Sequence, residues 1–363
     1  MTAATAEPRE PVAVTPEPDE RPVAIMPAAV SPAHRRTGKR RGRTRTRVRG
    51  VILRAGSAIL CRLPEAPLMA LADAAGELWY RTAPGRAAIG RANLRRVCQW
   101  LVEHDMATVP VRDAAVDPRA LERLLRAAFR HTARYYLEVA RAPGNTARTI
   151  DERLIVETPG VVNEALDGRA VIIVGLHFGA IELPAMFFAQ RSGLAVTIPM
   201  ETIEDAGLQA WFERTRGATG VRIVGLREAR RELMAALRRG EPVGLVGDRD
   251  LTGGGIRVPF FGAEASLPAG PGLLAMESGV RVYVAAVRRA AHGRYRGRLE
   301  GVSVPPGGTR RDRLTAFLTA EAQAFERAIA LAPEQWWALF FPIWPDLAPG
   351  STVGGPPTGG LPR

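Results

Sequence analysis

The pattern of hydrophobic and polar positions divides the chain into a helical first part and an α/β second part. Before residue 145 apolar residues recur at helical spacing, most clearly over 68–97 and 121–141. After residue 150 short apolar runs alternate with amphipathic segments, which is typical of strands and helices packed in layers. We expect strands at 171–176, 195–199, 242–247, 280–287 and 298–304, and helices at 183–190, 227–239 and 313–331. The predicted fold class is α/β, with a central, mostly parallel or mixed sheet flanked by helices and a helical N-terminal region.

The same pattern sets the expected domain boundaries. Residues 1–50 are predicted to be a disordered, basic arm, because proline, glutamate and alanine dominate its beginning and arginine its end. Residues 51–348 are predicted to form one folded domain, with a helical region at 51–145 and an α/β core at 150–348. Residues 349–363 are predicted to be a disordered tail. The basic run consists of Arg35, Arg36, Lys39, Arg40, Arg41, Arg43, Arg45, Arg47 and Arg49.

An amphipathic stretch follows the basic run. Its apolar stripe recurs at helical spacing, and Arg54 and Arg62 fall elsewhere on the helical wheel. Such a helix can lie on a membrane surface or pack against its own protein, and the sequence leaves both interpretations open. The stripe consists of Ile52, Ala55, Ile59 and Leu63.

Charge and composition narrow the class of partner. The 363 residues carry a formal net charge of +13, which favours an anionic partner such as a phosphorylated cosubstrate, a nucleic acid or an acidic membrane. The chain begins without the pattern of a secretory signal and has no apolar run long enough to cross a bilayer, so we expect neither export nor a membrane span. Cys61 and Cys98 form no metal or redox motif, which fits a reducing cytoplasm.

The most informative polar residues follow the first strong strand. His177 comes directly after the run 171–176, at the edge of an α/β sheet where ligands commonly bind. Glu182 follows five residues later. On one continuous helix the two side chains would point about 140° apart, so they can meet only if His177 lies in the turn before the helix. Gly179 and Pro184 favour such a turn.

A histidine and a carboxylate are the pair that acyl transfer to a hydroxyl needs. The imidazole takes the proton of the attacking hydroxyl and returns it to the leaving thiolate, while the carboxylate fixes the tautomer. The chain has no G-x-S-x-G motif and no cysteine beside a suitable base, so the expected nucleophile is the substrate's own hydroxyl. Taken alone, this spacing more often marks a buried histidine bonded to backbone, and the rest of the chain decides between the two.

Several motifs, in order and spacing, closely resemble the bacterial lipid A late acyltransferases and their relatives, the phosphatidylinositol mannoside acyltransferases. The resemblance runs from about residue 60 to 346 and is most specific between Asp248 and Gly272. The closer likeness is to the mannoside branch, although that branch typically has aspartate where this chain has Glu182. The motifs are HFGAIELP, IPMET, FERTRGATG, GDRDLTGGGIRVPFFGAEASLPAGPGLLA and APEQWWALFFPIW.

The resemblance implies roles for seven residues. It implies that His177 and Glu182 are the catalytic pair. It implies substrate or donor binding for Glu201, Arg216, Asp248, Arg249 and Asp250. Simpler interpretations are a structural ion pair between Arg216 and Asp250 and, for Phe260 and Phe261, core packing instead of an acyl channel.

The resemblance also implies the partners. The donor would be acyl-CoA or acyl carrier protein as a cosubstrate, with no cofactor and no metal. The acceptor would be a hydroxyl of a membrane glycolipid, and the protein would bind peripherally to an anionic membrane surface at the cytoplasmic face of the cell membrane. No nucleic acid partner is expected.

Two other classes remain open from the sequence. The D-x-D formed by Asp248 and Asp250 could bind a divalent metal in a nucleotide-sugar glycosyltransferase. The basic arm could bind nucleic acid, but no helix-turn-helix, RNP or zinc pattern accompanies it.

Overall fold

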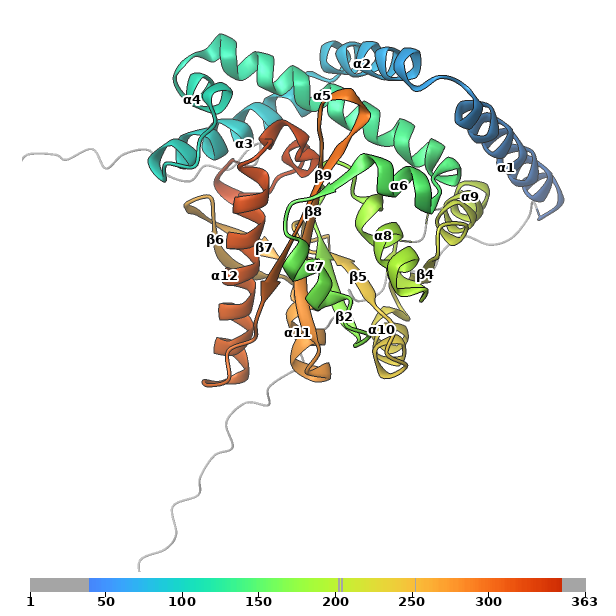
Figure 1. Cartoon of the computed structure of the whole chain (residues 1–363). Helices are drawn as coiled ribbons and strands as arrows, with labels where there is room; N and C mark the ends of the chain where they lie inside the picture. The colour runs from blue at the N-terminus through green and yellow to red at the C-terminus, as the bar shows by residue number, and fades with distance from the viewer. Residues whose placement is uncertain (1–38, 202, 204, 252, 348–363) are drawn as a thin grey trace, which may run out of the picture.

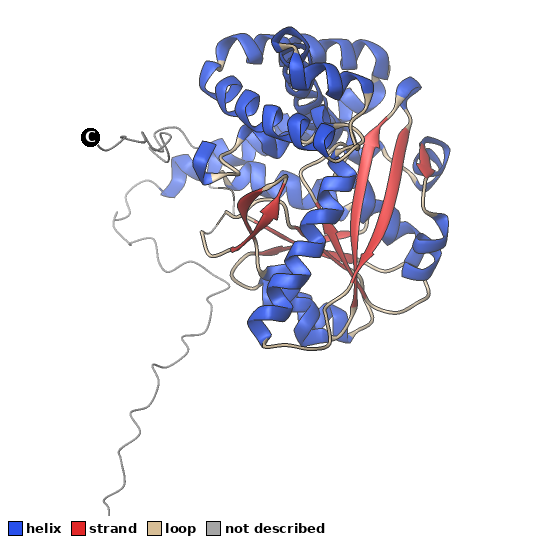
Figure 2. Cartoon of the chain, turned by 90° about the vertical axis from the view of Figure 1, so that its left-hand side faces the viewer, coloured by secondary structure: helices blue, strands red, loops and turns tan. Residues whose placement is uncertain are grey.

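The fold places a layer of N-terminal helices along one end of an α/β core. The computed structural model describes residues 39–201, 203, 205–251 and 253–347. Figure 1 shows the N-terminal helices across the top of the view, and Figure 2 shows the same layer above the sheet from the side. The layer consists of α1 (Lys39–Arg62), α2 (Glu65–Thr82), α3 (Pro84–Glu103), α4 (Val109–Val116) and α5 (Pro118–Arg141).

The core contains a seven-stranded sheet in the order β1-β9-β8-β2-β5-β3-β4, in which only the β8–β9 pair is antiparallel. A separate antiparallel hairpin joins β6 (Ile256–Phe260) to β7 (Ala263–Leu267). The strands of the large sheet are β1 (Leu154–Val156), β2 (Val171–Gly175), β3 (Val196–Met200), β4 (Val221–Gly225), β5 (Val243–Val246), β8 (Arg281–Arg289) and β9 (Tyr295–Val302).

Helices cover both faces of this sheet, which explains the continuous apolar runs of its central strands. In β2, Ile172 and Val174 belong to the core on one face, and Val171 and Ile173 to the core on the other. Residues of α10 (Ala229–Arg238), α11 (Gly270–Ser278) and α12 (Arg310–Ile329) fill the first core, and residues of α6 (Ala147–Arg153), α7 (Pro159–Ala165) and α8 (Glu182–Ser192) fill the second. The remaining helix is α9 (Ala206–Gly217).

The structure confirms the predicted fold class and the main elements of the core. Each of the five predicted strands and three predicted core helices has a counterpart, with ends shifted by a few residues. The prediction missed β1, β4 and the β6–β7 hairpin, which are short or have weak apolar patterns. One expectation is wrong in part, because α1 begins at Lys39, so residues 39–50 of the arm predicted to be disordered are helical. Residues 1–38 and the predicted tail lie outside the described residues.

Helix α1 exposes the apolar stripe that the sequence identified. Ile52 and Ile59 are 62% and 58% exposed, and Ala55 and Leu63 are also exposed. The helix attaches by its other side, where the Ser57 hydroxyl donates to the carbonyl of Ala140 in α5 at 2.6 Å. Leu71 and Leu78 add apolar exposure on the next helix, α2. In the described part of the chain, no helix combines the length and the apolar character that crossing a bilayer requires.

Candidate active site

The register of two neighbouring parallel strands brings His177 and Asp248 together. Gly175 at the end of β2 pairs with Val246 at the end of β5. His177 and Asp248 each lie two residues beyond these ends, so they emerge side by side at the carboxyl edge of the sheet. The Nδ1 atom of His177 lies 2.7 Å from Oδ1 of Asp248.

Asp248 is held as a buried carboxylate by three hydrogen bonds. Besides the imidazole, its Oδ2 accepts from the backbone N–H of His177 at 2.9 Å and from Trp336 Nε1–H at 2.7 Å. Burial disfavours its charge, but the nearby imidazole and these donors outweigh burial and lower the pKa of Asp248. An ionised Asp248 requires the proton of a neutral His177 to be on Nδ1, which leaves the Nε2 lone pair to accept a proton from a substrate.

The loop that carries His177 is fixed by its backbone. Gly179 has φ of +51°, and its N–H donates to the carbonyl of Gln335. A Cβ atom at this position would lie 2.0 Å from the carbonyl oxygen of Val287, so only glycine fits. The carbonyl of His177 accepts from the N–H of Trp337 at 2.9 Å. The C-terminal segment therefore anchors the loop, and His177 lies in the turn before α8, as the sequence predicts.

Trp337, which begins the short helix η4 (Trp337–Phe340), forms a wall beside the histidine. Its ring meets the His177 ring edge-on, with centroids 4.4 Å apart, and stacks on Tyr135 from α5 at 4.8 Å. Its Nε1–H is buried and has no hydrogen-bond partner within the described residues. The site therefore contains a donor next to His177 that the fold does not use.

Glu182 binds Arg216, not His177. The guanidinium of Arg216 donates to both Glu182 carboxylate oxygens, at 3.0 and 2.6 Å, and the side chains are 17% and 18% exposed. Burial opposes the charge of Arg216, but Glu182 outweighs it and raises the pKa of Arg216. From the sequence, Glu182 is expected to orient the imidazole ring and fix its tautomer. In the structure Asp248 has this role. The simpler interpretation of Arg216, an ion pair with Asp250, does not hold, because the carboxylate that binds Arg216 is Glu182.

The other three predicted site residues follow the ends of β3 and β5. Glu201 follows the end of β3 and is exposed. Arg249 is partly buried, with its Cζ atom 3.5 Å from the ring centroid of Phe341. Asp250 shapes the following loop, accepting from the N–H groups of Gly253 and Gly255 and from the Ser266 hydroxyl.

The two aspartates of the D-x-D motif do not face a common point. Asp248 is engaged by His177 and Trp336, and Asp250 by its own loop. A metal site needs carboxylate oxygens that converge on one ion. No group of three potential metal ligands occurs in the part of the chain that the structure describes. The arrangement of the carboxylates therefore does not favour the glycosyltransferase alternative.

Phe260 and Phe261 are core residues. Both are almost fully buried and pack against Trp336 and Trp344, with ring centroids 5.7 to 6.3 Å apart. This aromatic cluster packs around the indole of Trp336, which donates to Asp248, and so stabilises the position of that donor.

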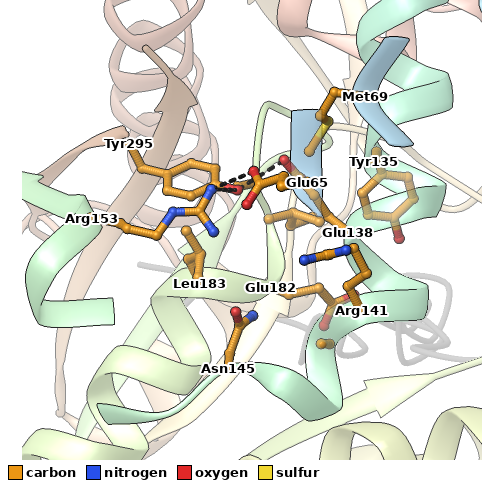
Figure 3. Close-up of a pocket in the computed structure, with 13 residues that line it drawn as sticks. Glu65, Met69, Tyr135, Glu138, Arg141, Asn145, Arg153, Glu182, Leu183 and Tyr295 are labelled. Atoms are coloured by element: carbon orange, nitrogen blue, oxygen red, sulfur yellow. Dashed lines mark hydrogen bonds and ion pairs between the residues drawn. The ribbon is translucent and has the colours of Figure 1, made fainter. Parts of the chain in front are cut away.

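A small cavity with both polar and apolar residues in its wall includes Glu182 in its lining (Figure 3). Within it Arg153 donates to Glu65 at 2.6 Å, and the Tyr295 hydroxyl donates to Glu138 at 3.1 Å. Its volume is about 40 Å³, which is room for a few water molecules and not for a sugar ring. We therefore do not assign it a substrate. Its polar lining comes from Glu65, Glu138, Arg141, Asn145, Arg153, Glu182 and Tyr295.

Glu321 of α12 is a buried carboxyl group behind the site. It is 0% exposed, and neither carboxylate oxygen has a hydrogen-bond partner in the described structure. Burial, followed by the charge of Asp248, raises the pKa of Glu321 well above its ordinary value of 4.5. Burial and the neighbouring Asp248 charge therefore both favour the protonated form of Glu321.

The raised pKa of Glu321 predicts a pH-dependent difference in stability between the wild type and Glu321→Gln. A raised pKa in the folded state gives stability that is complete below the unfolded pKa of 4.5 and is lost as pH rises through the folded pKa. The free energy of unfolding of the wild type should therefore fall relative to that of the variant above pH 4.5, by up to about 1.4 kcal/mol per pH unit. Urea unfolding across this range measures the difference, and parallel profiles for the two proteins would contradict it.

Sequence reasoning missed Trp336, Trp337 and Glu321. The tryptophans lie in the segment APEQWWALFFPIW, whose resemblance to the family was visible, but nothing in the sequence placed them beside His177. The unpaired state of Glu321 depends on its neighbours in the fold, so no sequence signal could reveal it.

The fold and the site define an α/β enzyme with a histidine–aspartate pair arranged as a general base. Comparison with known proteins gives the particular family. Residues 45–342 match the family model described as bacterial lipid A biosynthesis acyltransferase. The chain therefore belongs to this family and is an acyltransferase.

Two similar proteins are phosphatidylinositol mannoside acyltransferases. The protein of Mycolicibacterium smegmatis is 30% identical over 222 residues, covering 60% of this chain and 71% of that protein. The protein of Mycobacterium tuberculosis (strain CDC 1551 / Oshkosh) is 29% identical over 237 residues, covering 63% of this chain and 73% of that protein. These matches confirm the family that the sequence motifs indicated.

Proposed function

We propose that this acyltransferase moves a fatty acyl chain from acyl-CoA or acyl carrier protein to a hydroxyl of a membrane glycolipid. The acceptor would be similar to a phosphatidylinositol mannoside or to lipid A, and the similarity to two mannoside acyltransferases favours the first. The observation that supports the chemistry best is the His177–Asp248 hydrogen bond at the sheet edge in a chain of an acyltransferase family.

The proposed reaction is a direct transfer between substrates. His177 Nε2 takes the proton of the acceptor hydroxyl as its oxygen attacks the thioester carbonyl carbon. The tetrahedral intermediate collapses with cleavage of the carbon–sulfur bond, and His177 returns the proton to the thiolate. The products are an ester and a free thiol. Asp248 keeps the Nδ1 proton in place and stabilises the imidazolium formed between the two steps.

Glu182 has a different part in this proposal from the one that the motif suggested. It holds the Arg216 guanidinium by two charge-assisted hydrogen bonds. This ion pair connects the first residue of α8, which is Glu182, to Arg216 in α9. We propose that Glu182 and Arg216 shape the acceptor side of the site, with Glu201 at its exposed rim. Asp250 supports the site by ordering the loop around Gly253.

Lipid mass spectrometry of a strain lacking the gene tests this proposal. The expected result is the loss of one acyl chain from a membrane glycolipid, and its restoration by the wild-type gene but not by a His177→Asn gene. The mass difference identifies the acyl chain and the acceptor together. A lipid profile identical to that of the parent strain, under conditions in which the protein is produced, would count against the proposal.

We also propose that the protein binds an anionic membrane surface peripherally, at the cytoplasmic face. The apolar face of α1 and α2 supports this, because Ile52, Ile59, Leu71 and Leu78 are each about 60% exposed or more. The sequence of the adjoining segment 35–49 is rich in arginine, which suits anionic lipid. An apolar face next to a basic segment is typical of interfacial helices.

Substituting Ile59 and Leu71 with serine is expected to weaken vesicle binding at least tenfold. Full burial of each side chain in an apolar phase contributes roughly 1.5–3 kcal/mol to the binding free energy. A tenfold loss of affinity corresponds to about 1.4 kcal/mol, so partial insertion of both side chains is sufficient for this effect. Co-sedimentation with vesicles containing anionic lipid measures it, at low and high salt. Val116→Ser on α4, where the valine is 83% exposed, is the matched control. Equal sedimentation of the double variant and the control would contradict the membrane face.

A further inference from the structure

Two arginines meet on one aromatic ring next to the catalytic pair. Arg249 directly follows Asp248, and its Cζ atom lies 3.5 Å from the centroid of the Phe341 ring. Arg86, in the first turn of α3, has its Cζ atom 4.7 Å from the same centroid and donates from Nη1 to the carbonyl of Phe340 at 2.9 Å. The N-terminal helical layer and the carboxyl edge of the sheet therefore each place one guanidinium group against the Phe341 ring.

Neither of these two positive charges is in direct contact with a carboxylate in the described structure. Burial lowers the pKa of Arg249, the charges of Glu201 and Asp248 oppose this, and the like charge of Arg86 makes a smaller contribution to the lowering. In the described structure neither arginine forms an ion pair with a carboxylate within 4 Å. The cation–π contacts hold the two guanidinium groups on the Phe341 ring but do not remove the repulsion between their charges.

Other arginines close to the site are used differently. Arg216 is paired with Glu182, Arg288 with Glu157 and Arg289 with Glu138, each through two hydrogen bonds. The positive charge of each of these guanidinium groups is neutralised by its carboxylate partner, and these ion pairs stabilise the fold. Among the described residues Arg86 donates one hydrogen bond, to the Phe340 carbonyl, and Arg249 donates none. A planar guanidinium with donors to spare is suited to phosphate oxygens.

We propose that Arg86 and Arg249, held on the Phe341 ring, bind the phosphate of the phosphopantetheine arm of the thioester donor. This inference rests on the proposed acyl transfer. Acyl-CoA and acyl carrier protein share this phosphate, so one site serves either donor. The position of Arg249, directly after the residue that orients His177, places the anchor within reach of a flexible arm whose far end is the reacting thioester.

The test compares donors that differ in their phosphate groups. Acyl-pantetheine has none, acyl-phosphopantetheine has one, and acyl-CoA has more, while the thioester is the same. The wild type should have a kcat/KM at least tenfold higher for acyl-phosphopantetheine than for acyl-pantetheine, because the phosphate accepts charge-assisted hydrogen bonds that acyl-pantetheine cannot make. In Arg86→Gln/Arg249→Gln this preference should fall to near one, with a much smaller change for acyl-pantetheine.

Arg95→Gln is the matched control, since Arg95 lies on α3 and is exposed. It should keep the full preference for the phosphorylated donor. An equal loss of kcat/KM for all three donors in the double variant would show a structural role and overturn the inference. A rise in the KM for the acceptor with an unchanged donor preference would also overturn it, by assigning the arginines to an acceptor phosphate. Absence of transfer from every donor by the wild type would instead contradict the proposed function itself.

Discussion

Replacing His177 with asparagine is expected to lower kcat for acyl transfer by roughly 10²–10⁴-fold, the usual contribution of a general base. The asparagine amide nitrogen can occupy the place of Nδ1 and donate to Asp248, so the buried carboxylate keeps its partner. The variant lacks only the Nε2 atom that accepts the proton. Initial rates of thiol release in the presence of acceptor measure the loss, and circular dichroism and thermal unfolding confirm the fold.

His177→Ala provides the companion measurement. It should be as inactive as the asparagine variant, but less stable by about 1–3 kcal/mol, because Asp248 loses one of its three donors. Near wild-type turnover in either variant would remove His177 from the chemistry. Equal stability of the two variants would show that the His177 side chain does not support Asp248.

Replacing Asp248 with asparagine is expected to lower kcat to a similar extent. The amide oxygen can keep the two bonds that Oδ2 accepts, from His177 N–H and Trp336 Nε1–H. The amide NH₂ then faces Nδ1 of the imidazole, which must become an acceptor and carry its proton on Nε2. This tautomer cannot take a proton from the substrate. The effect should appear in kcat, with a smaller change in the KM of the donor.

Glu182→Gln distinguishes this account from the pairing that the sequence motif suggested. The glutamine loses one of the two acceptors of Arg216 and leaves a mostly buried guanidinium partly unpaired, so stability should fall by about 1–3 kcal/mol. Its kcat should fall less than that of Asp248→Asn. If kcat fell more in Glu182→Gln than in Asp248→Asn, Glu182 and not Asp248 would be the carboxylate that supports the base.

The fold class and the central elements could be predicted because their signals are local. The apolar run 171–176 and the helix that Gly240 ends are visible in the sequence, and both are present in the structure. The turn at His177 could also be predicted, since Gly179 favours a backbone that helices do not allow. The structure adds the reason, which is the close approach of the Val287 carbonyl.

The partners of the site residues could not be predicted, because they depend on which strands are neighbours. His177 and Asp248 both follow strand ends, but 71 residues separate them, and only the β2–β5 register places them opposite each other. Five residues separate His177 from Glu182, so the sequence suggested the wrong carboxylate for the imidazole. The indole of Trp336 reaches Asp248 from 88 residues away, and no local pattern encodes such a contact.

The central claim is that a hydroxyl of the acceptor attacks the thioester directly, with His177 as the base. The most direct measurement follows an isotopically labelled acyl group during incubation of purified protein with the acyl-thioester, with and without glycolipid acceptor. The account predicts one thiol released for each labelled acceptor molecule, no thiol release without acceptor, no label on the protein, and no product with His177→Asn. Label attached covalently to the protein, or labelled acceptor formed by His177→Asn at the wild-type rate, would contradict it.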